Sequence, residues 1–120
     1  MKRRFRLTRS TDFKRVRNEG KSYAHPLVVL VAAHSTEPES RIGVSAGRAL
    51  GGAVQRNRAK RLLRESMRSI LHVLPNGWDL VLIARNPLVV AQFKDVKLAV
   101  YGLLRRANLI DVNQTPDDVR

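Results

Sequence analysis

The residues best suited to chemistry in this chain are the cations of one short segment, residues 51–64. A glycine pair is followed there by a helix-forming sequence with five cations and an asparagine within nine residues. At about 100° per residue, polar residues collect in one arc of roughly 100° and apolar residues on the opposite side. The polar face holds Asn57, Lys60, Arg61, Arg64 and Arg68, and the apolar face holds Ala59, Leu62, Leu63, Met67, Ile70 and Leu74.

The polar face of this helix predicts a phosphate ligand. Like charges at i, i+3 and i+4 repel one another, so the face is unfavourable unless an anion neutralises it. A solvated helix face normally mixes both signs, yet Glu65 is the only acid between Arg41 and Arg68. Arginine binds phosphate through a planar fork of donors and also stacks on unpaired bases. We therefore expect the helix to bind a polyanion.

The charge of the whole chain favours a nucleic-acid partner. Its 120 residues include 23 Lys and Arg against 10 Asp and Glu, which gives a formal net charge of +13. Residues 1–21 and residues 41–68 each contribute +7, and the rest of the chain sums to −1. Positive charge gathered in two blocks is typical of a nucleic-acid-binding protein.

Other chemistries lack the residues that they need. The chain has no cysteine, which excludes a disulfide framework and a thiolate metal site. The aspartates and histidines lie in separate segments without metal-ligand spacing, and no phosphate-loop motif occurs. We predict no catalytic residue and no metal site, and we interpret Asp12 and Asp95 as dipole or capping residues. Phe13 has two open interpretations, a core residue or a stacking surface for an unpaired base.

Alternating helical and strand patterns predict the elements that position these residues. A basic arm is expected over residues 1–9, then a short helix over Thr11–Asn18, capped by Ser10 or Thr8 and ended by Gly20. Strands are expected from Tyr23, over Leu27–Ala33, over Arg41–Ala46 and over Trp78–Ala84, the last apolar on both faces and therefore central. A hairpin loop is expected over His34–Ser40, and the basic helix is expected to end near Pro75-Asn76-Gly77. A last helix, from Val90 or Phe93 to Ala107, has the inward stripe Phe93, Val96, Val100, Leu103 and Leu104.

The order of these elements predicts one domain. Strand, helix and strand between Arg41 and Ala84 imply a parallel crossover through the basic helix, for which the general rule favours a right-handed connection. We place a single RNA-binding domain at residues 1–108 and a disordered tail at residues 109–120. No apolar run approaches the 18 or so residues of a membrane span, so we expect no membrane association and a cytoplasmic location.

Several of these segments resemble one known family. The run Gly51-Gly52-Ala53-Val54-Gln55-Arg56-Asn57-Arg58-Ala59-Lys60-Arg61 closely resembles the signature of the bacterial ribonuclease P protein subunit. So do Ser10-Thr11-Asp12-Phe13 followed by Gly20, the strand Arg41-Ile42-Gly43-Val44-Ser45, and Leu80–Arg85 before Asn86-Pro87. The matching segments occur in the family's order over roughly residues 3–107.

The resemblance implies a fold and a function. The fold is an α+β, two-layer sandwich with a mixed four-stranded sheet, about three helices and an unusual left-handed crossover at the basic helix. The function is that of the protein subunit of ribonuclease P, which binds the catalytic RNA and the 5′ leader of precursor tRNA. That ribonucleoprotein is an endoribonuclease that removes the leader; its RNA carries the catalysis and needs magnesium, while the protein alone is inactive. One protein is expected per RNA.

The resemblance also assigns residues to two surfaces. The RNA-facing set is Arg56, Asn57, Arg58, Lys60, Arg61, Arg64 and Arg68. The leader-binding cleft is Phe13, Arg17, Val31, Ser45 and Arg48. This chain has Arg17 and Val31 where family members often carry aromatics, and Gly52 where they often carry asparagine, so charge is expected to contribute more to leader binding here.

Two other functions fit the same charge and size. A ribosomal-type protein or a general RNA chaperone would need no substrate cleft. A duplex-DNA binder would insert the basic helix into the major groove, which calls for a helix-turn-helix or a dimer that the sequence does not signal.

Overall fold

A mixed four-stranded sheet forms the centre of the protein. The computed structural model describes residues 5–111 and 113. The strands are β1 (Lys21–Ala24), β2 (Val28–His34), β3 (Arg41–Ser45) and β4 (Trp78–Ala84), in the spatial order β1-β2-β4-β3. β1 pairs with β2 and β2 with β4 in antiparallel fashion, whereas β3 pairs with β4 in parallel.

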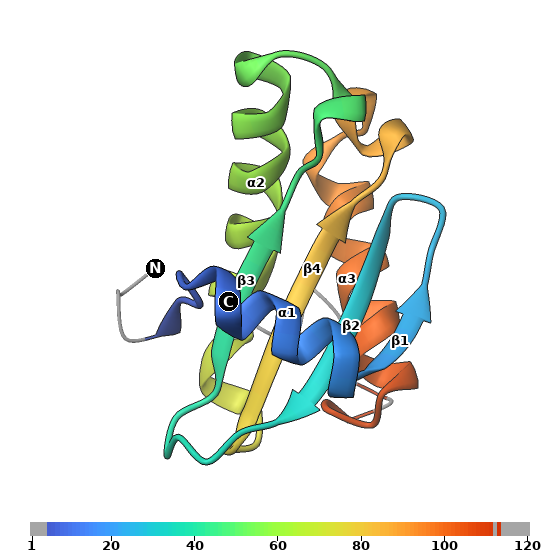
Figure 1. Cartoon of the computed structure of the whole chain (residues 1–120). Helices are drawn as coiled ribbons and strands as arrows, with labels where there is room; N and C mark the ends of the chain where they lie inside the picture. Colours follow the sequence, from blue (N-terminus) through green and yellow to red (C-terminus); the bar gives the residue numbers. More distant parts are fainter. Residues whose placement is uncertain (1–4, 112, 114–120) are drawn as a thin grey trace.

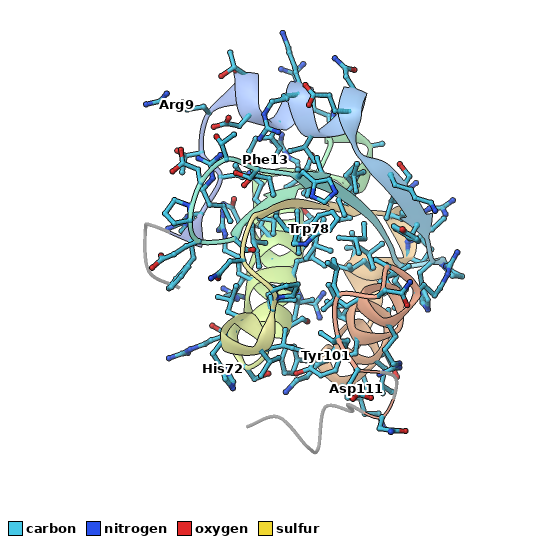
Figure 2. The ribbon with its side chains drawn as sticks, turned by 90° about the horizontal axis from the view of Figure 1, so that it is seen from below. Arg9, Phe13, His72, Trp78, Tyr101 and Asp111 are labelled. Atoms are coloured by element: carbon cyan, nitrogen blue, oxygen red, sulfur yellow. The ribbon has the colours of Figure 1, made fainter. Side chains whose placement is uncertain are left out.

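Helices cover both faces of this sheet. α1 (Ser10–Glu19) crosses one face alone, and α2 (Ala53–Arg68) and α3 (Phe93–Arg106) lie together on the other (Figures 1 and 2). Three short 3-10 helices complete the described chain: η2 (Arg48–Leu50), η3 (Leu71–Val73) and η4 (Asn86–Val90). The expected α+β fold with a mixed sheet is confirmed, but the layers are helix, sheet and helix rather than the two of the expected sandwich.

Side-chain alternation along β2 and β4 builds two cores. Leu30, Leu80 and Leu82 face α2 and α3 and pack with residues such as Leu63 and Tyr101. The intervening residues face α1, where the smaller core contains Leu7, Val16, Val31, Ala33 and Val81. β4 is central and buried on both sides, as its continuous apolar sequence predicts.

The connection between β2 and β3 is not the expected hairpin. β4 lies between these two strands and pairs with both of them. The parallel pair of β3 and β4, joined through α2, confirms the crossover. Its handedness stays a prediction.

Several predicted boundaries also change. α2 ends at Arg68, where Ile70 N–H donates to the carbonyl of Met67 and the chain tightens toward η3, so the helix does not reach Pro75. Arg9 is the N-cap of α1 and makes no side-chain capping bond, so the predicted Ser10 or Thr8 cap is wrong. Phe93 is 39% exposed, so it does not belong to the buried stripe of α3, which Val96, Val100, Leu103 and Leu104 form.

The ordered domain extends past the predicted boundary at residue 108. Leu109 and Ile110 are 4% and 8% exposed and belong to the larger core. Most of the predicted tail, residues 112 and 114–120, lies outside the described residues, as do residues 1–4 of the arm. None of the helices in the described part of the chain is both long and apolar enough to cross a membrane.

Gly20 joins α1 to β1 at a point of close backbone approach. Its φ of −81° is one that any residue adopts, so space rather than conformation requires glycine here. A Cβ at this position would lie 2.5 Å from the Val16 carbonyl oxygen, 2.7 Å from Val31 Cγ1 and 2.9 Å from the Ala32 carbonyl oxygen. Two of these neighbours are backbone atoms that cannot rotate away.

We predict that Gly20→Ala lowers the free energy of unfolding by about 1–3 kcal/mol, because the added methyl group forces α1 away from the sheet. Urea denaturation measures the change. Gly47→Ala is the matched control, since no atom lies within 4 Å of its added Cβ. Equal stability of the two variants would contradict the close approach.

Candidate nucleic-acid interface

A buried carboxylate ties α1 to one end of the sheet. Asp79, at the start of β4, is fully buried. It accepts hydrogen bonds from Arg15 of α1 and from Arg41 of β3, the latter at 3.0 Å from Nε and 2.8 Å from Nη2. Arg41 Nη2 is also 3.8 Å from a carboxylate oxygen of Asp12. The hydrogen bond to Asp79 raises the pKa of Arg41 against the opposing effect of burial.

The strand register shows which part of the sheet α1 covers. On its face the residues form three rows across β2, β4 and β3: Ala33–Asp79–Arg41, Val31–Val81–Gly43, and Val29–Ile83–Ser45. Asp79 and Val81 are fully buried, whereas Val29, Ile83 and Ser45 are each half-buried. Figure 1 shows the same division, with α1 across the lower part of the sheet and no element in front of the upper part. We call the row Val29, Ile83 and Ser45 the open strip.

Two side chains of α1 border the open strip. The half-buried Phe13 ring lies over Gly43, where an added Cβ would come within 2.5 Å of Phe13 Cζ. Figure 2 shows Phe13 between α1 and the sheet. Arg17, which is exposed, donates from Nη2 to Ser45 Oγ at 3.1 Å. Phe13 packs against the smaller core but is only half-buried, so neither of its two interpretations is excluded.

The structure places some residues of the predicted cleft side by side and separates others. The structure brings Phe13, Arg17 and Ser45 together, and it leaves Arg48 exposed on η2, after the end of β3. Val31 is 3% exposed beneath α1, so its assignment to an accessible cleft surface is wrong. Sequence reasoning missed Val29 and Ile83, because the period of two fixes the face of a strand but not the row at which a helix crosses it.

Most of the basic helix presents its cations as the periodicity predicts. Asn57, Arg61 and Arg68 are exposed, Lys60 and Arg64 are half-buried, and Ala59, Leu63 and Met67 on the opposite face are buried. Arg68 Nη1 lies 3.6 Å from Glu65, an exposed pair on adjacent turns. Arg56 is half-buried, and its Nε has no hydrogen-bond partner.

Arg58 differs from the other cations of α2. Its Nη1 donates to the carbonyl of Val89, and its Nη2 donates to the carbonyl of Ala91 at 3.1 Å. These bonds attach α2 to the segment at the end of η4. Arg58 therefore packs α2 against this segment, a contact that the sequence did not predict, and its place in the RNA-facing set stays a prediction.

The basic arm meets the basic helix beside β3. Arg6 forms a parallel bridge with Ile42, and Leu7 N–H donates to the Ile42 carbonyl at 2.8 Å. Burial, and to a smaller degree the charge of Arg6, lower the pKa of Arg64. Cations from the two charged blocks of the sequence thus lie on one side of the molecule, where a polyanion would relieve their repulsion.

Comparisons with known proteins agree with this architecture. A family model described as Ribonuclease P matches residues 1–108. The chain is 40% identical to the ribonuclease P protein component of Chloroflexus aurantiacus over 111 residues, covering 92% of this chain and 82% of that protein. It is 38% identical to that of Roseiflexus castenholzii over 120 residues, covering 98% of both.

Two solved structures share the fold. The Staphylococcus aureus RNase P protein superposes with a TM-score of 0.81 at 26% identity, covering 89% of this chain and 98% of that one. The Thermotoga maritima RNase P protein superposes with a TM-score of 0.75 at 33% identity, covering 84% and 96%.

Fold and surface together define a small α+β protein with a cationic helix and arm beside a partly covered sheet. With the comparisons, the particular family is clear: the chain belongs to the ribonuclease P protein component family. The resemblance seen in the sequence is thereby confirmed, and membership implies an RNA partner and a place in tRNA processing.

The resemblance places Arg58 and Arg61 together in the RNA-facing set, whereas the structure gives them different contacts. We predict that Arg58→Ala lowers the free energy of unfolding by about 1–3 kcal/mol, because two partly buried carbonyls lose a charged donor. Arg61→Ala should stay within about 0.5 kcal/mol of the wild type, since Arg61 is exposed. Urea denaturation compares the two variants, and an unaltered midpoint for Arg58→Ala would refute the packing role.

Proposed function

We propose that the protein binds the RNA subunit of ribonuclease P through its basic helix and arm, and holds the 5′ leader of precursor tRNA on the open strip. The observation that carries the proposal is the crossing of α1, which stops one row short of Val29, Ile83 and Ser45. α1 therefore leaves the half-buried side chains of Val29 and Ile83 next to the half-buried Phe13 and the exposed Arg17.

Single-stranded RNA matches this combination of groups. Unpaired bases stack on aromatic rings, and a positive groove follows the phosphates. Here Phe13 supplies the ring, Val29 and Ile83 supply the apolar floor, and Arg17 is the cation at the edge. A duplex hides its base faces, so it would use the charge of this surface but not the ring or the floor.

In this proposal the RNA performs the cleavage and the protein assists. The two oxygens of Asp79 already accept bonds from Arg15 and Arg41, and Asp12 lies near Arg41, so these carboxylates are engaged in holding α1. Magnesium belongs to the RNA in the holoenzyme, with one protein per RNA. The complex acts in the cytoplasm as an endoribonuclease.

A general RNA-binding or ribosomal-type protein is the competing function. It would account for the cations of α2 and the arm, but it gives no role to an accessible Phe13 beside the open strip. Reconstitution with the cognate RNA and precursor tRNA separates the two, because only a subunit of ribonuclease P would favour the substrate that carries a leader.

We predict that Phe13→Ala weakens holoenzyme binding of precursor tRNA by about 1–3 kcal/mol, the size expected for one base–aromatic contact. Binding of mature tRNA should change little, because it has no leader. Phe93→Ala is the control, since this exposed ring lies on α3 at the other face of the sheet. Equal losses for both tRNAs, together with a lowered melting temperature, would mean that Phe13 serves only the core.

We predict that the protein alone does not cleave precursor tRNA at any magnesium concentration, and that the RNA alone cleaves at high magnesium and salt. Adding the protein should move that activity to lower magnesium, because its cations screen phosphate repulsion. Asp12→Asn and Asp95→Asn should keep the cleavage rate at saturating substrate within a few-fold. A loss of several orders of magnitude with intact assembly would point to a protein nuclease.

A further inference from the structure

Exposed apolar side chains gather on the side of the molecule that α2 and α3 form. The described part of the chain has five large apolar residues that are exposed, and none of them belongs to α1 or to a strand. They are Val54 of α2, Val73 of η3, Val90 of η4, and Phe93 and Leu98 of α3. Single exposed apolar residues are common on protein surfaces, but several on one side indicate an interaction surface.

Four of these residues border the groove between α2 and α3. The two helices lie side by side on the face of the sheet opposite α1 (Figure 2). At one end of the groove, Arg58 bonds the two carbonyls that flank Val90, and Val54 lies one helical turn before Arg58. At the other end, Ser69 Oγ lies 3.0 Å from the hydroxyl of Tyr101. The groove is therefore held at both ends, and a site with fixed walls loses little entropy when a partner binds.

The groove contains a hollow of about 370 Å³. The hollow is lined by Glu65, Arg68, Ser69, His72, Phe93 and Lys97. Lys97 Nζ lies 5.8 Å from the centroid of the Phe93 ring, in a cation–π contact. Lys94 and Leu98 are exposed one helical turn apart on α3. The surface thus offers a concave pocket with aliphatic side chains and lysines along its edge.

Cations outnumber acids on both helices that form the groove. Four of the cations border it: Arg61 and Arg68 of α2, and Lys94 and Lys97 of α3. Each helix contains a single acid, Glu65 in α2 and Asp95 in α3. Glu65 is already 3.6 Å from Arg68. A partner with acidic residues therefore complements the charge of the groove.

The aliphatic side chains distinguish this surface from a nucleic-acid surface. Unpaired bases stack on aromatic rings, and Val54, Val90 and Leu98 have none. The ring of Phe93 already has Lys97 over it. Phosphates would pair with the lysines but would leave the aliphatic side chains uncovered. The apolar stripe of an amphipathic helix covers such side chains, and acids beside the stripe pair with the cations.

We propose that the groove between α2 and α3 binds an acidic amphipathic helix of a protein partner. Arg58 and Ser69, which hold its two ends, lie about 16 Å apart along α2 at 1.5 Å per residue, so the groove accommodates roughly three turns of a partner helix. The groove and the open strip lie on opposite faces of the sheet. A partner in the groove therefore leaves the open strip uncovered, and the proposal does not depend on the function of the strip.

A synthetic helical peptide tests the groove with the full-length protein. The peptide has leucines at positions i, i+3, i+4 and i+7 and glutamates elsewhere, and its matched control has the same composition in scrambled order. Both peptides carry the same charge, so the difference between them measures recognition of the apolar stripe. At roughly physiological salt, which screens nonspecific attraction, fluorescence anisotropy should show that the amphipathic peptide binds about 10-fold or more tightly than the scrambled one.

Apolar variants locate the peptide on the protein. The double variant Val90→Ser and Leu98→Ser should weaken binding of the amphipathic peptide roughly 10-fold or more, because two aliphatic side chains no longer become buried. Val73→Ser is the matched control, since this exposed valine lies outside the groove, beside Leu109 and Ile110. It should bind the peptide as the wild type does. Circular dichroism and urea denaturation check that the variants stay folded.

Charge variants locate the acids of the peptide. Lys94→Glu should weaken binding roughly 3-fold or more, because it places a like charge opposite the glutamates. Lys14→Glu makes the same change in net charge at an exposed position of α1, on the opposite face of the sheet, and should have a smaller effect.

Three results would overturn the proposal. The first is equal binding of the two peptides, or no binding of either at up to about 1 mM. The second is equal weakening by the groove variants and their controls, which would mean that net charge alone attracts the peptide. The third is binding of phosphatidylglycerol-containing vesicles, but not of the peptide, that the Val90 and Leu98 changes abolish. That result would assign the groove to a membrane surface.

Discussion

The buried carboxylate of Asp79 is the interaction on which the candidate site depends. A charge without water is stable only when it is paired and hydrogen-bonded, and Arg15 and Arg41 supply that pairing from α1 and β3. Because Asp79 lies near the start of β4, the bonds fix α1 over one end of the sheet. Two rows of residues are then covered, and the third row, Val29, Ile83 and Ser45, stays accessible. The open strip is accessible because α1 is held away from it.

The candidate site also depends on where the fold places the cations. The arm bridges to Ile42 and brings Arg6 close enough to influence Arg64 of α2, although the two residues belong to separate basic blocks of the sequence. Like charges that the fold holds together cost stability in the free protein, and binding of a polyanion removes that cost. Under the proposed function, the cationic side at β3 faces the RNA subunit and the open strip beside it takes unpaired nucleotides.

The local pattern of apolar and polar residues predicted much of this structure. It missed the contacts between residues that lie far apart in the sequence. The period of 3.6 identified the faces of α2, and the double-sided apolar run identified β4 as central. The partners of Asp79 are 64 and 38 residues away, and no local signal connects them. The sequence also could not give the role of Arg58. Its position in the helical repeat is the same whether its side chain bonds the carbonyls of Val89 and Ala91 or faces solvent. Val31 and Val29 share a face, and only the position of α1 decides which one is covered.

Site-specific cross-linking in the assembled holoenzyme tests the central claim most directly. The chain has no cysteine, so a single introduced thiol carries the only photoreactive label. Ile83→Cys places the label on the open strip, and Leu98→Cys places it on α3, at a position that is 53% exposed on the other face of the sheet. We expect the label at residue 83 to cross-link leader nucleotides of bound precursor tRNA, and the label at residue 98 to leave the leader unmodified. Cross-links from residue 83 that fall only on the RNA subunit or the tRNA body, or equal leader cross-linking from residue 98, would contradict the account.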